Sequence, residues 1–340
     1  MVVVMSPQAT PTDVDAVVER VTTAGGEAFV SRGVSRTIVG LVGDLEQFQE
    51  LNLPAMTGVA DVIRVSTPYK LVSRTHHPDR STVTVGGVAI GPDTFTLVAG
   101  PCAVESAGQT LEAAEMAKAA GATLLRGGAF KPRTSPYAFQ GLGEKGLAIL
   151  AEVREATGLP VVTEVVDAGD VPLVASYADM LQVGTRNMSN FSLLQAVGES
   201  GRPVLLKRGM TATIEEWLMA AEYVAQRGSL DIVLCERGVR TFETAYRNTL
   251  DVSAVPVVQA LSHLPVMVDP SHSGGRRDLV IPLSRAAIAV GADGILVDVH
   301  PHPEEALCDG PQALVDADLR TLAATVRQLP PVLGRRVPTP

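Results

Sequence analysis

The segment FTLVAGPCAVESAGQTLEAAEMAKAAGATLLRGG, residues 95–128, contains the repeating unit from which we predict the fold. It begins with one short apolar run, FTLVAGP, and ends with another, ATLLRGG. Between them lies a helical pattern, with Ser106 and Gln109 spaced as a capping box and Gly121 at its end. Short apolar runs bounded by turn residues are typical of strands buried on both faces of a parallel sheet. The segment therefore predicts a strand, a helix and a second parallel strand.

The same unit recurs through the rest of the chain. Including the two runs above, we predict eight strands: FTLVAGP, ATLLRGG, PVVTEVV, DMLQVGT, PVLLKRG, DIVLCER, PVMVDPS and DGILVDVH. A second clear helix, TIEEWLMAAEYVAQRG, has Thr213 and Glu216 at capping-box spacing and Gly228 at its end. Eight strand–helix units indicate an α/β fold, specifically a (β/α)8 TIM barrel.

A smaller domain is predicted before the barrel. In residues 1–67, apolar strands alternate with a helix over 13–26 and a short helix over 44–51, in the order βαββαβ of a ferredoxin-like domain. Residues 68–80 are predicted to be a linker. The barrel is expected over 81–330, beginning with a hairpin that turns at Gly86 and Gly87. The Pro-rich end, residues 331–340, is predicted to be a loosely held tail.

The composition excludes several classes of function. The 340 residues include 28 Lys and Arg against 37 Asp and Glu, a net charge of −9, which argues against broad binding to nucleic acid or to an anionic membrane. No apolar run approaches the length of a membrane span, and the first residues lack a signal-peptide pattern, so we expect a cytoplasmic protein. Three cysteines without a CxxC pair do not predict a disulfide framework.

Cations gather where the predicted strands end. Active sites of such barrels lie at the carboxyl ends of the strands. In this sequence those ends carry Arg126, Lys131, Arg133, Arg186, Lys207 and Arg237. Removing charges from water costs several kcal/mol each unless they are paired, so this set predicts anionic ligands. The alternative is a set of structural ion pairs with Glu144, Glu164 and Glu236, which explains any single cation but not all six.

A second group of strand-end residues could hold a metal ion. Cys102 follows the first barrel strand, His272 the seventh, and Asp298 and Asp309 lie at or after the eighth. The first and eighth strands become neighbours when a barrel closes, and a thiol, an imidazole and carboxylates suit a divalent transition metal. A lone Cys or His is more often structural, so only the shared location favours a metal site. Cys235 and Cys308 are predicted to be structural.

Several long motifs together resemble one enzyme family: AGPCAVES, LRGGAFKPRTSPYAFQG, QVGTRNMSNFSLL, LCERGVRTFETAYRNTLD and VDPSHSGGRRDLVIPLSRAAIAVGADG. They are similar to 3-deoxy-D-arabino-heptulosonate 7-phosphate (DAHP) synthases, in the subgroup related to 3-deoxy-D-manno-octulosonate (KDO) 8-phosphate synthase. The resemblance covers roughly residues 95–325. It implies the entry step of the shikimate pathway, in which phosphoenolpyruvate condenses with erythrose 4-phosphate and inorganic phosphate leaves.

The resemblance also implies roles for individual residues. It assigns phosphoenolpyruvate to Arg126, Lys131, Arg186, Lys207 and Arg237. It assigns erythrose 4-phosphate to Arg133, Thr134 and Ser135. Cys102, His272, Asp298 and Asp309 match the positions that bind Mn²⁺, Fe²⁺, Co²⁺ or Zn²⁺, and we predict Lys131, Cys102 and His272 as the catalytic residues. The ion is expected to polarise the aldehyde oxygen while the methylene carbon of phosphoenolpyruvate attacks.

Asp298 is the one position that departs from the family pattern. The family usually has Glu there, so this chain offers a carboxylate that is shorter by one methylene. Metal–ligand bonds tolerate only a few tenths of an ångström, roughly 0.2 Å. A direct bond from Asp298 therefore needs a shift of the backbone, a bridging water or a different coordination number.

Three other functions compete with this interpretation. KDO 8-phosphate synthase, which uses arabinose 5-phosphate, usually carries Asn in the segment that reads KPRTS here. A Schiff-base aldolase would use Lys207 as its nucleophile. A non-catalytic sensor would have lost the chemistry. By resemblance, residues 1–67 are also a candidate regulatory domain for an aromatic amino acid effector, and the protein is expected to be a homotetramer.

Overall fold

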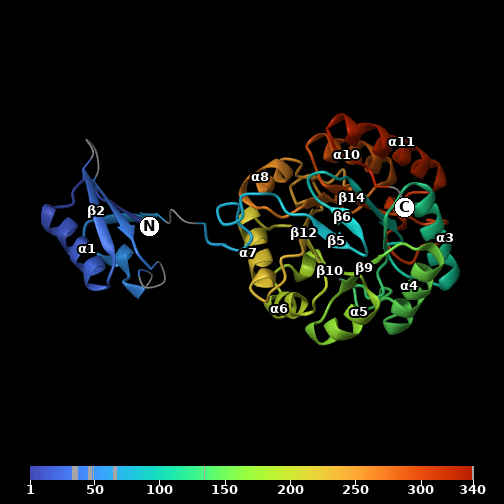
Figure 1. Cartoon of the computed structure of the whole chain (residues 1–340), viewed down its shortest axis with the longest axis horizontal. Coiled ribbons are helices and arrows are strands. Elements are labelled where there is room, and N and C mark those ends of the chain that lie inside the picture. The colour runs from blue at the N-terminus through green and yellow to red at the C-terminus, as the bar shows by residue number, and fades with distance from the viewer. Residues whose placement is uncertain (33–36, 45–47, 49, 64–66, 134, 339–340) are drawn as a thin grey trace. The chain divides into compact units, whose positions relative to one another are not determined.

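The computed structural model describes residues 1–340 except 33–36, 45–47, 49, 64–66, 134 and 339–340 (Figure 1). The chain divides into two compact units, Met1–Pro68 and Tyr69–Pro340. Each unit has its own buried apolar core and is described separately below.

The first unit is a four-stranded antiparallel sheet with a helix on one face. Its elements are β1 (Val2–Met5), α1 (Pro11–Thr23), β2 (Glu27–Arg32), β3 (Thr37–Val42), η1 (Leu53–Ala55) and β4 (Val59–Ile63). The strand order β2-β3-β1-β4 is that of a ferredoxin-like domain. Thr10 and Asp13 form a capping box that starts α1, whose buried valines pack on Val3 and Met5. Half of the predicted helix over 44–51, residues 45–47 and 49, lies outside the described residues.

The second unit contains a closed barrel of eight parallel strands, as predicted. They are β7 (Thr96–Gly100), β8 (Leu124–Arg126), β9 (Val161–Val165), β10 (Met180–Val183), β11 (Val204–Lys207), β12 (Ile232–Glu236), β13 (Val266–Val268) and β14 (Gly294–Asp298). Each lies within one of the eight apolar runs of the sequence. Strand β14 pairs with β7 and closes the sheet, so the TIM barrel is confirmed. Every residue of these strands is buried, which explains their continuous apolar pattern.

Helices surround the strands (Figure 1). They are α3 (Ala107–Ala119), α4 (Glu144–Thr157), α5 (Val171–Tyr177), α6 (Phe191–Glu199), α7 (Ile214–Ala225), α8 (Ala254–Leu261), α9 (Pro270–Gly274), α10 (Arg277–Ala289) and α11 (Asp316–Val332), with short 3-10 turns at Ala168–Asp170, Thr185–Asn187 and Gly310–Gln312. Thr213 and Glu216 form the predicted capping box of α7. At α3, Ser106 accepts from the Gln109 N–H, whereas the Gln109 side chain accepts from Glu105. No helix in the described part of the chain is long and apolar enough to cross a membrane.

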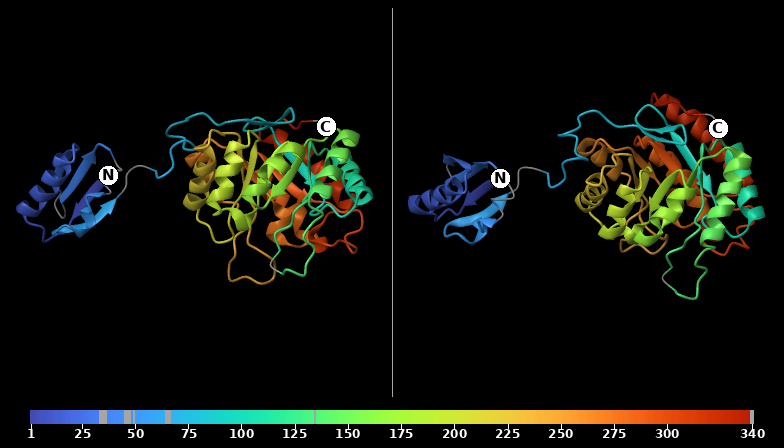
Figure 2. Two further views of the ribbon diagram at one scale, coloured as in Figure 1. Left: turned by 90° about the horizontal axis from the view of Figure 1, so that it is seen from below. Right: turned by 60° about the horizontal axis from the view of Figure 1, so that its bottom comes forward.

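A hairpin closes the amino-terminal end of the barrel. Strands β5 (Val83–Val85) and β6 (Val88–Ile90) turn at Gly86 and Gly87, whose φ angles of 53° and 89° suit glycine. The hairpin packs its buried apolar side chains against inward-facing barrel residues such as Val98 and Leu124. Figure 2 shows the hairpin at one end of the barrel and long loops, green and orange, projecting from the other. The carboxyl-terminal mouth is therefore the end that remains open.

The predicted linker is bonded to the barrel along most of its length. The buried carboxylate of Glu222 on α7 accepts the backbone N–H groups of Lys70, Leu71 and Val72 at 3.0, 3.0 and 3.1 Å. Further on, the backbone N–H of Ser81 donates to the His263 carbonyl at 2.8 Å. The segment after residue 69 is thus part of the barrel unit.

The end of the chain differs from the predicted loose tail. The Arg335 guanidinium lies 2.7 Å from the Asp293 carboxylate, which is fully buried. The backbone of Arg336 bonds to Asp93 and Phe95 at 2.9 and 2.8 Å. A buried carboxylate needs a counter-charge, so Asp293 holds the tail in place as far as Arg336. The prediction from the Pro-rich composition was wrong for this stretch.

Candidate active site

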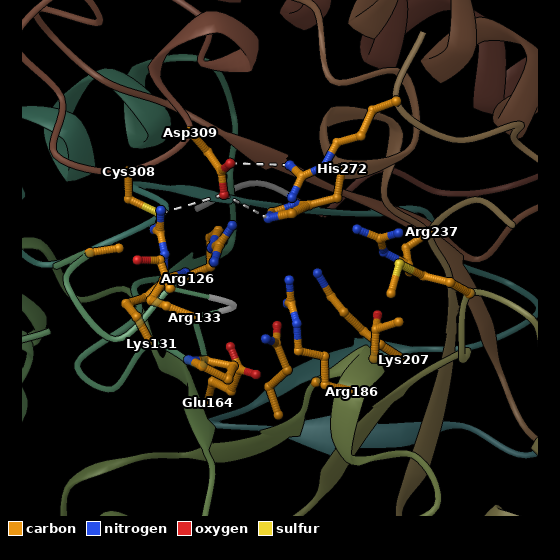
Figure 3. A pocket seen from close by; sticks show the side chains of 18 residues that line it. Arg126, Lys131, Arg133, Glu164, Arg186, Lys207, Arg237, His272, Cys308 and Asp309 are labelled. Carbon is orange, nitrogen blue, oxygen red and sulfur yellow. Dashed lines mark hydrogen bonds and ion pairs between the residues drawn. The ribbon is translucent and has the colours of Figure 1, made fainter. Parts of the chain in front are cut away.

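A pocket of about 330 Å³ lies at the carboxyl-terminal mouth of the barrel (Figure 3). Its cationic lining residues are Arg126, Lys131, Arg133, Arg186, Lys207, Arg237 and Arg247. The only carboxylates among its described lining residues are Glu164 and Asp309. All six cations that the sequence placed at strand ends therefore meet in one cavity. Ser135 also lines it, whereas Thr134 lies outside the described residues.

Two of the cations are held by buried aspartates from the ends of strands that lie two positions away in the barrel. Arg126, the last residue of β8, forms an ion pair with Asp298 at the end of β14. Lys207, the last residue of β11, forms an ion pair with Asp269, which follows β13. Burial alone lowers the pKa of Arg126, but Asp298, together with Cys102, Asp269 and Glu164, outweighs burial and raises the pKa. These partners are aspartates rather than the glutamates that we considered from the sequence.

Arg237 and Lys131 are also buried. Arg237 is 5% exposed, and within the described structure its NH1 atom has no hydrogen-bond partner. Burial lowers the pKa of its guanidinium, the opposite of the shift at Arg126. The Lys131 ammonium donates to the Cys102 carbonyl at 2.9 Å and to Cys102 Sγ at 3.2 Å. Burial lowers the pKa of Lys131, but Cys102, Cys308 and Glu164 together outweigh burial and raise the pKa, so the side chain stays cationic.

A cluster of sulfur, nitrogen and oxygen donors borders this pocket. Cys102 Sγ lies 3.7 Å from His272 Nε2 and 3.2 Å from Asp309 Oδ2, and the latter two atoms are 3.7 Å apart. Figure 3 shows Cys308, Asp309 and His272 at one edge of the pocket, across from Arg186 and Lys207. Cys102, His272 and Asp298 also lie close enough to share an ion, within 4.8 Å of one another. The residues named from the sequence therefore form a cluster whose donor set suits a divalent metal.

Asp269 orients His272 in this cluster. It caps helix α9, because its Oδ1 accepts the His272 backbone N–H at 2.8 Å. Its other oxygen, Oδ2, lies 2.8 Å from His272 Nδ1. Burial alone lowers the pKa of the imidazole, but Asp269 and Asp298 outweigh burial and raise it. The ring nitrogen that faces Cys102 and Asp309 is thus Nε2, with a carboxylate behind Nδ1.

Four residues that contribute to the site were missed or undervalued in the sequence: Cys308, Arg247, Gln312 and Asp269. Cys308, predicted to be structural, lies 3.8 Å from Cys102 Sγ and accepts from Arg133 at 2.6 Å. Arg247 donates to Asp309 and to Gln312, both at 3.1 Å. Asp269 directly follows the seventh predicted strand but was given no role from the sequence. The position of Cys308 directly before Asp309 was a usable signal, whereas Arg247 comes from a long loop and gave none.

These observations define a class: a TIM-barrel enzyme whose cation-lined mouth lies beside a buried Cys/His/Asp cluster. The family model described as the DAHP synthetase I family matches residues 56–333, and the DAHP synthase ferredoxin-like domain matches residues 1–67. The chain belongs to the DAHP synthetase I family.

Individual relatives agree with this assignment. The chain is 51% identical to a phospho-2-dehydro-3-deoxyheptonate aldolase of Thermotoga maritima, covering 99% of this chain and 100% of that one. A crystal structure of DAHP synthase from the same organism superposes with a TM-score of 0.91 at 50% identity, over 99% of both chains. A 2-dehydro-3-deoxyphosphooctonate aldolase of Pelobacter propionicus is 35% identical over 74% of this chain and 98% of its own.

Proposed function

We propose how this mouth performs the reaction of a 3-deoxy-7-phosphoheptulonate synthase, the activity that the family and the full-length match give to this chain. In that reaction phosphoenolpyruvate and erythrose 4-phosphate give DAHP and inorganic phosphate at the start of the shikimate pathway. The observation that carries the proposal is a single pocket lined by seven cations and two carboxylates beside a Cys/His/Asp cluster. Two phosphorylated substrates, one of them also a carboxylate, supply the missing negative charge.

Phosphoenolpyruvate is proposed to occupy four buried cations together with Arg186, which is exposed. The proposed set is Arg126, Lys131, Arg186, Lys207 and Arg237. Guanidinium groups suit the forked recognition of carboxylate and phosphate, and lysines act as point charges beside them. Because Arg126 and Lys207 are already fixed by aspartates, they present oriented donors without having to reorganise. Arg237 is buried and its NH1 atom has no partner among the described residues, so this cation gains most from a bound anion.

Erythrose 4-phosphate is proposed to bind toward Arg133, Thr134 and Ser135, in the loop after β8. Arg133 reaches Cys308 from this loop, so the aldose phosphate and the Cys/His/Asp cluster share one side of the pocket. This arrangement brings the aldehyde close to the cluster and to Lys131. Lys131 keeps its proton, so it serves as a fixed positive charge near the carbonyl oxygen rather than as a base.

A divalent ion fits the cluster by donor type and by spacing. Ligand atoms around a tetrahedral ion lie roughly 3.3–3.8 Å apart when bonds are 2.0–2.3 Å long. The separations among Cys102, His272 and Asp309 are 3.2, 3.7 and 3.7 Å. Mn²⁺, Fe²⁺, Co²⁺ and Zn²⁺ are all compatible with this donor set. When bound, such an ion supplies Lewis acidity toward the aldehyde oxygen.

The competing functions fit less well. Lys207 is ion-paired with Asp269, and an ion pair is made by the ammonium, not by the free amine that a Schiff base requires. The match to the octulosonate enzymes covers 74% of this chain and is weaker than the 51% identity over its full length.

The decisive assay measures phosphate released from phosphoenolpyruvate. We expect release with erythrose 4-phosphate and at least about 100-fold slower release with arabinose 5-phosphate. This ratio corresponds to a difference of about 2.7 kcal/mol between the two activation free energies. Chelation is expected to abolish activity, and return of Mn²⁺, Co²⁺ or Zn²⁺ to restore it. Full activity after chelation would refute the metal requirement. Reductive trapping of an imine by borohydride would instead favour the Schiff-base route.

We further propose that the ferredoxin-like domain regulates the barrel in response to an aromatic amino acid. Its presence supports regulation, and the predicted homotetramer offers contacts between copies through which it could act. Because residues 70–72 are bonded to Glu222, a truncation should begin at Tyr69 and not near residue 80. We expect tyrosine or phenylalanine to inhibit the full chain and not the truncated one. An equal response of the full chain and the truncated chain would contradict this proposal.

A further inference from the structure

Both oxygens of Asp298 are engaged by protein groups. Oδ1 pairs with Arg126, and Oδ2 accepts from Gln312 Nε2 at 2.6 Å. The side chain is fully buried at the end of β14. Arg247 donates to the carbonyl oxygen of the Gln312 amide at 3.1 Å, and this bond turns the amide nitrogen toward Asp298. The carboxylate is therefore fixed from two sides by residues outside the Cys/His/Asp cluster.

Asp298 also meets His272 on the side of the ring away from the cluster. Its Oδ2 lies 3.6 Å from Nδ1, whereas Cys102 and Asp309 face Nε2. A histidine that binds a metal through one nitrogen usually gives the other N–H to a carboxylate. Asp269, 2.8 Å from Nδ1, and Asp298 behind it occupy that supporting position. An ion held by Nε2 would therefore be separated from Asp298 by the imidazole ring.

Cys308 offers the cluster a further metal-binding atom, in place of the carboxylate of Asp298. Its Sγ lies 3.8 Å from Cys102 Sγ and 3.5 Å from Asp309 Oδ2. Two thiolates bound to one tetrahedral ion lie roughly 3.8 Å apart when the metal–sulfur bonds are 2.3 Å long. Cys102, Cys308 and Asp309 lie within 4.8 Å of one another, a second possible donor group that also uses Cys102. A soft thiolate in this place suits the same metals as Cys102.

We propose that the divalent ion takes its protein donors from Cys102, His272, Asp309 and Cys308, and that Asp298 is a positioning residue for Arg126. This inference rests on the proposed function, in which the cluster holds an ion. The shorter carboxylate then has a physical reason: it ends where it can pair with Arg126 and Gln312. Asp298 then acts on the reaction mainly through Arg126 in the phosphoenolpyruvate site, because its contact with His272, at 3.6 Å, is longer than the 2.8 Å contact of Asp269.

Cobalt(II) loaded into the metal-free protein tests the donor set, because thiolate-to-cobalt charge-transfer absorption reports the number of bound thiolates. We expect one Co²⁺ per chain, and Cys308→Ser to lose about half of that absorption. Cys235→Ala is the matched control, because this cysteine lies within β12, where burial raises the pKa of its thiol to about 12. The control is expected to keep the full absorption. Full absorption in Cys308→Ser would overturn the inference.

Asp298→Asn tests the other half of the inference and does not depend on how Cys308→Ser folds. We expect unchanged Co²⁺ stoichiometry and spectrum, with a KM for phosphoenolpyruvate at least about tenfold higher, because Arg126 loses its charged partner. Loss of Co²⁺ from Asp298→Asn would show that Asp298 is a ligand and refute the inference. Absence of Co²⁺ binding by the unsubstituted protein would instead refute the metal site of the proposed function.

Discussion

Arg237→Met is expected to lower kcat/KM for phosphoenolpyruvate by about 10³-fold, because a buried charge-assisted contact contributes about 4 kcal/mol to ligand recognition. The same substitution is expected to raise the free energy of unfolding of the unliganded protein. Arg237 is 5% exposed, and its NH1 atom lacks a partner within the described structure. Burial lowers the pKa of its guanidinium, so folding keeps a charge where water cannot solvate it. Methionine removes that cost and preserves much of the volume.

The measurement combines steady-state kinetics with denaturant unfolding. We expect a stability gain of about 1–2 kcal/mol in the absence of substrate. Phosphoenolpyruvate should raise the melting temperature of the unsubstituted protein and have little effect on the variant, because a ligand stabilises only a form that binds it. Arg276→Met is the matched control: Arg276 is half exposed and pairs with Asp278 at the surface. A less stable Arg237→Met would contradict the argument.

The fold was largely predictable because the barrel strands are buried on both faces. Each of the eight strands lies inside an apolar run that the sequence displays without interruption, and glycines or prolines mark the boundaries. The hairpin was equally clear, since Gly86 and Gly87 both adopt positive φ. The tail was not predictable, because its order depends on the ion pair between Arg335 and Asp293, which are 42 residues apart in the chain.

Site residues could be predicted where they lie at or just after a barrel strand, and less well where they come from long loops. Six cations could be placed in the mouth because each lies at or shortly after a strand. Arg247 could not, because it comes from the loop between β12 and α8, whose path no periodicity specifies. Cys308 was misjudged for a different reason. A cysteine in a loop has no pattern of its own, and only the three-dimensional fold brings its sulfur to 3.8 Å from Cys102 Sγ.

Asp269→Asn is expected to damage both stability and catalysis. The asparagine oxygen can still cap helix α9, so the substitution mainly removes the negative charge. That charge faces Lys207 and His272. Burial raises the pKa of Asp269, but His272 and Lys207 together outweigh burial and lower the pKa. Removing one member of a buried ion pair costs about 3–5 kcal/mol of stability. Removing the carboxylate behind a metal-binding imidazole weakens metal affinity by about 10–100-fold.

Asp293→Asn provides the matched control at the opposite end of the same barrel. Asp293 is also fully buried, pairs with Arg80 and Arg335, and accepts the backbone N–H of Val266 at 2.7 Å. We expect a similar loss of stability, measured by denaturant unfolding, with Co²⁺ affinity and kcat of the folded enzyme unchanged. The two aspartates thus have the same burial and the same kind of partners, and differ in which end of the strands they occupy. Equal loss of metal affinity in both variants would mean that Asp269 acts only through general stability. A loss confined to Asp269→Asn would identify its carboxylate as the group that orients His272.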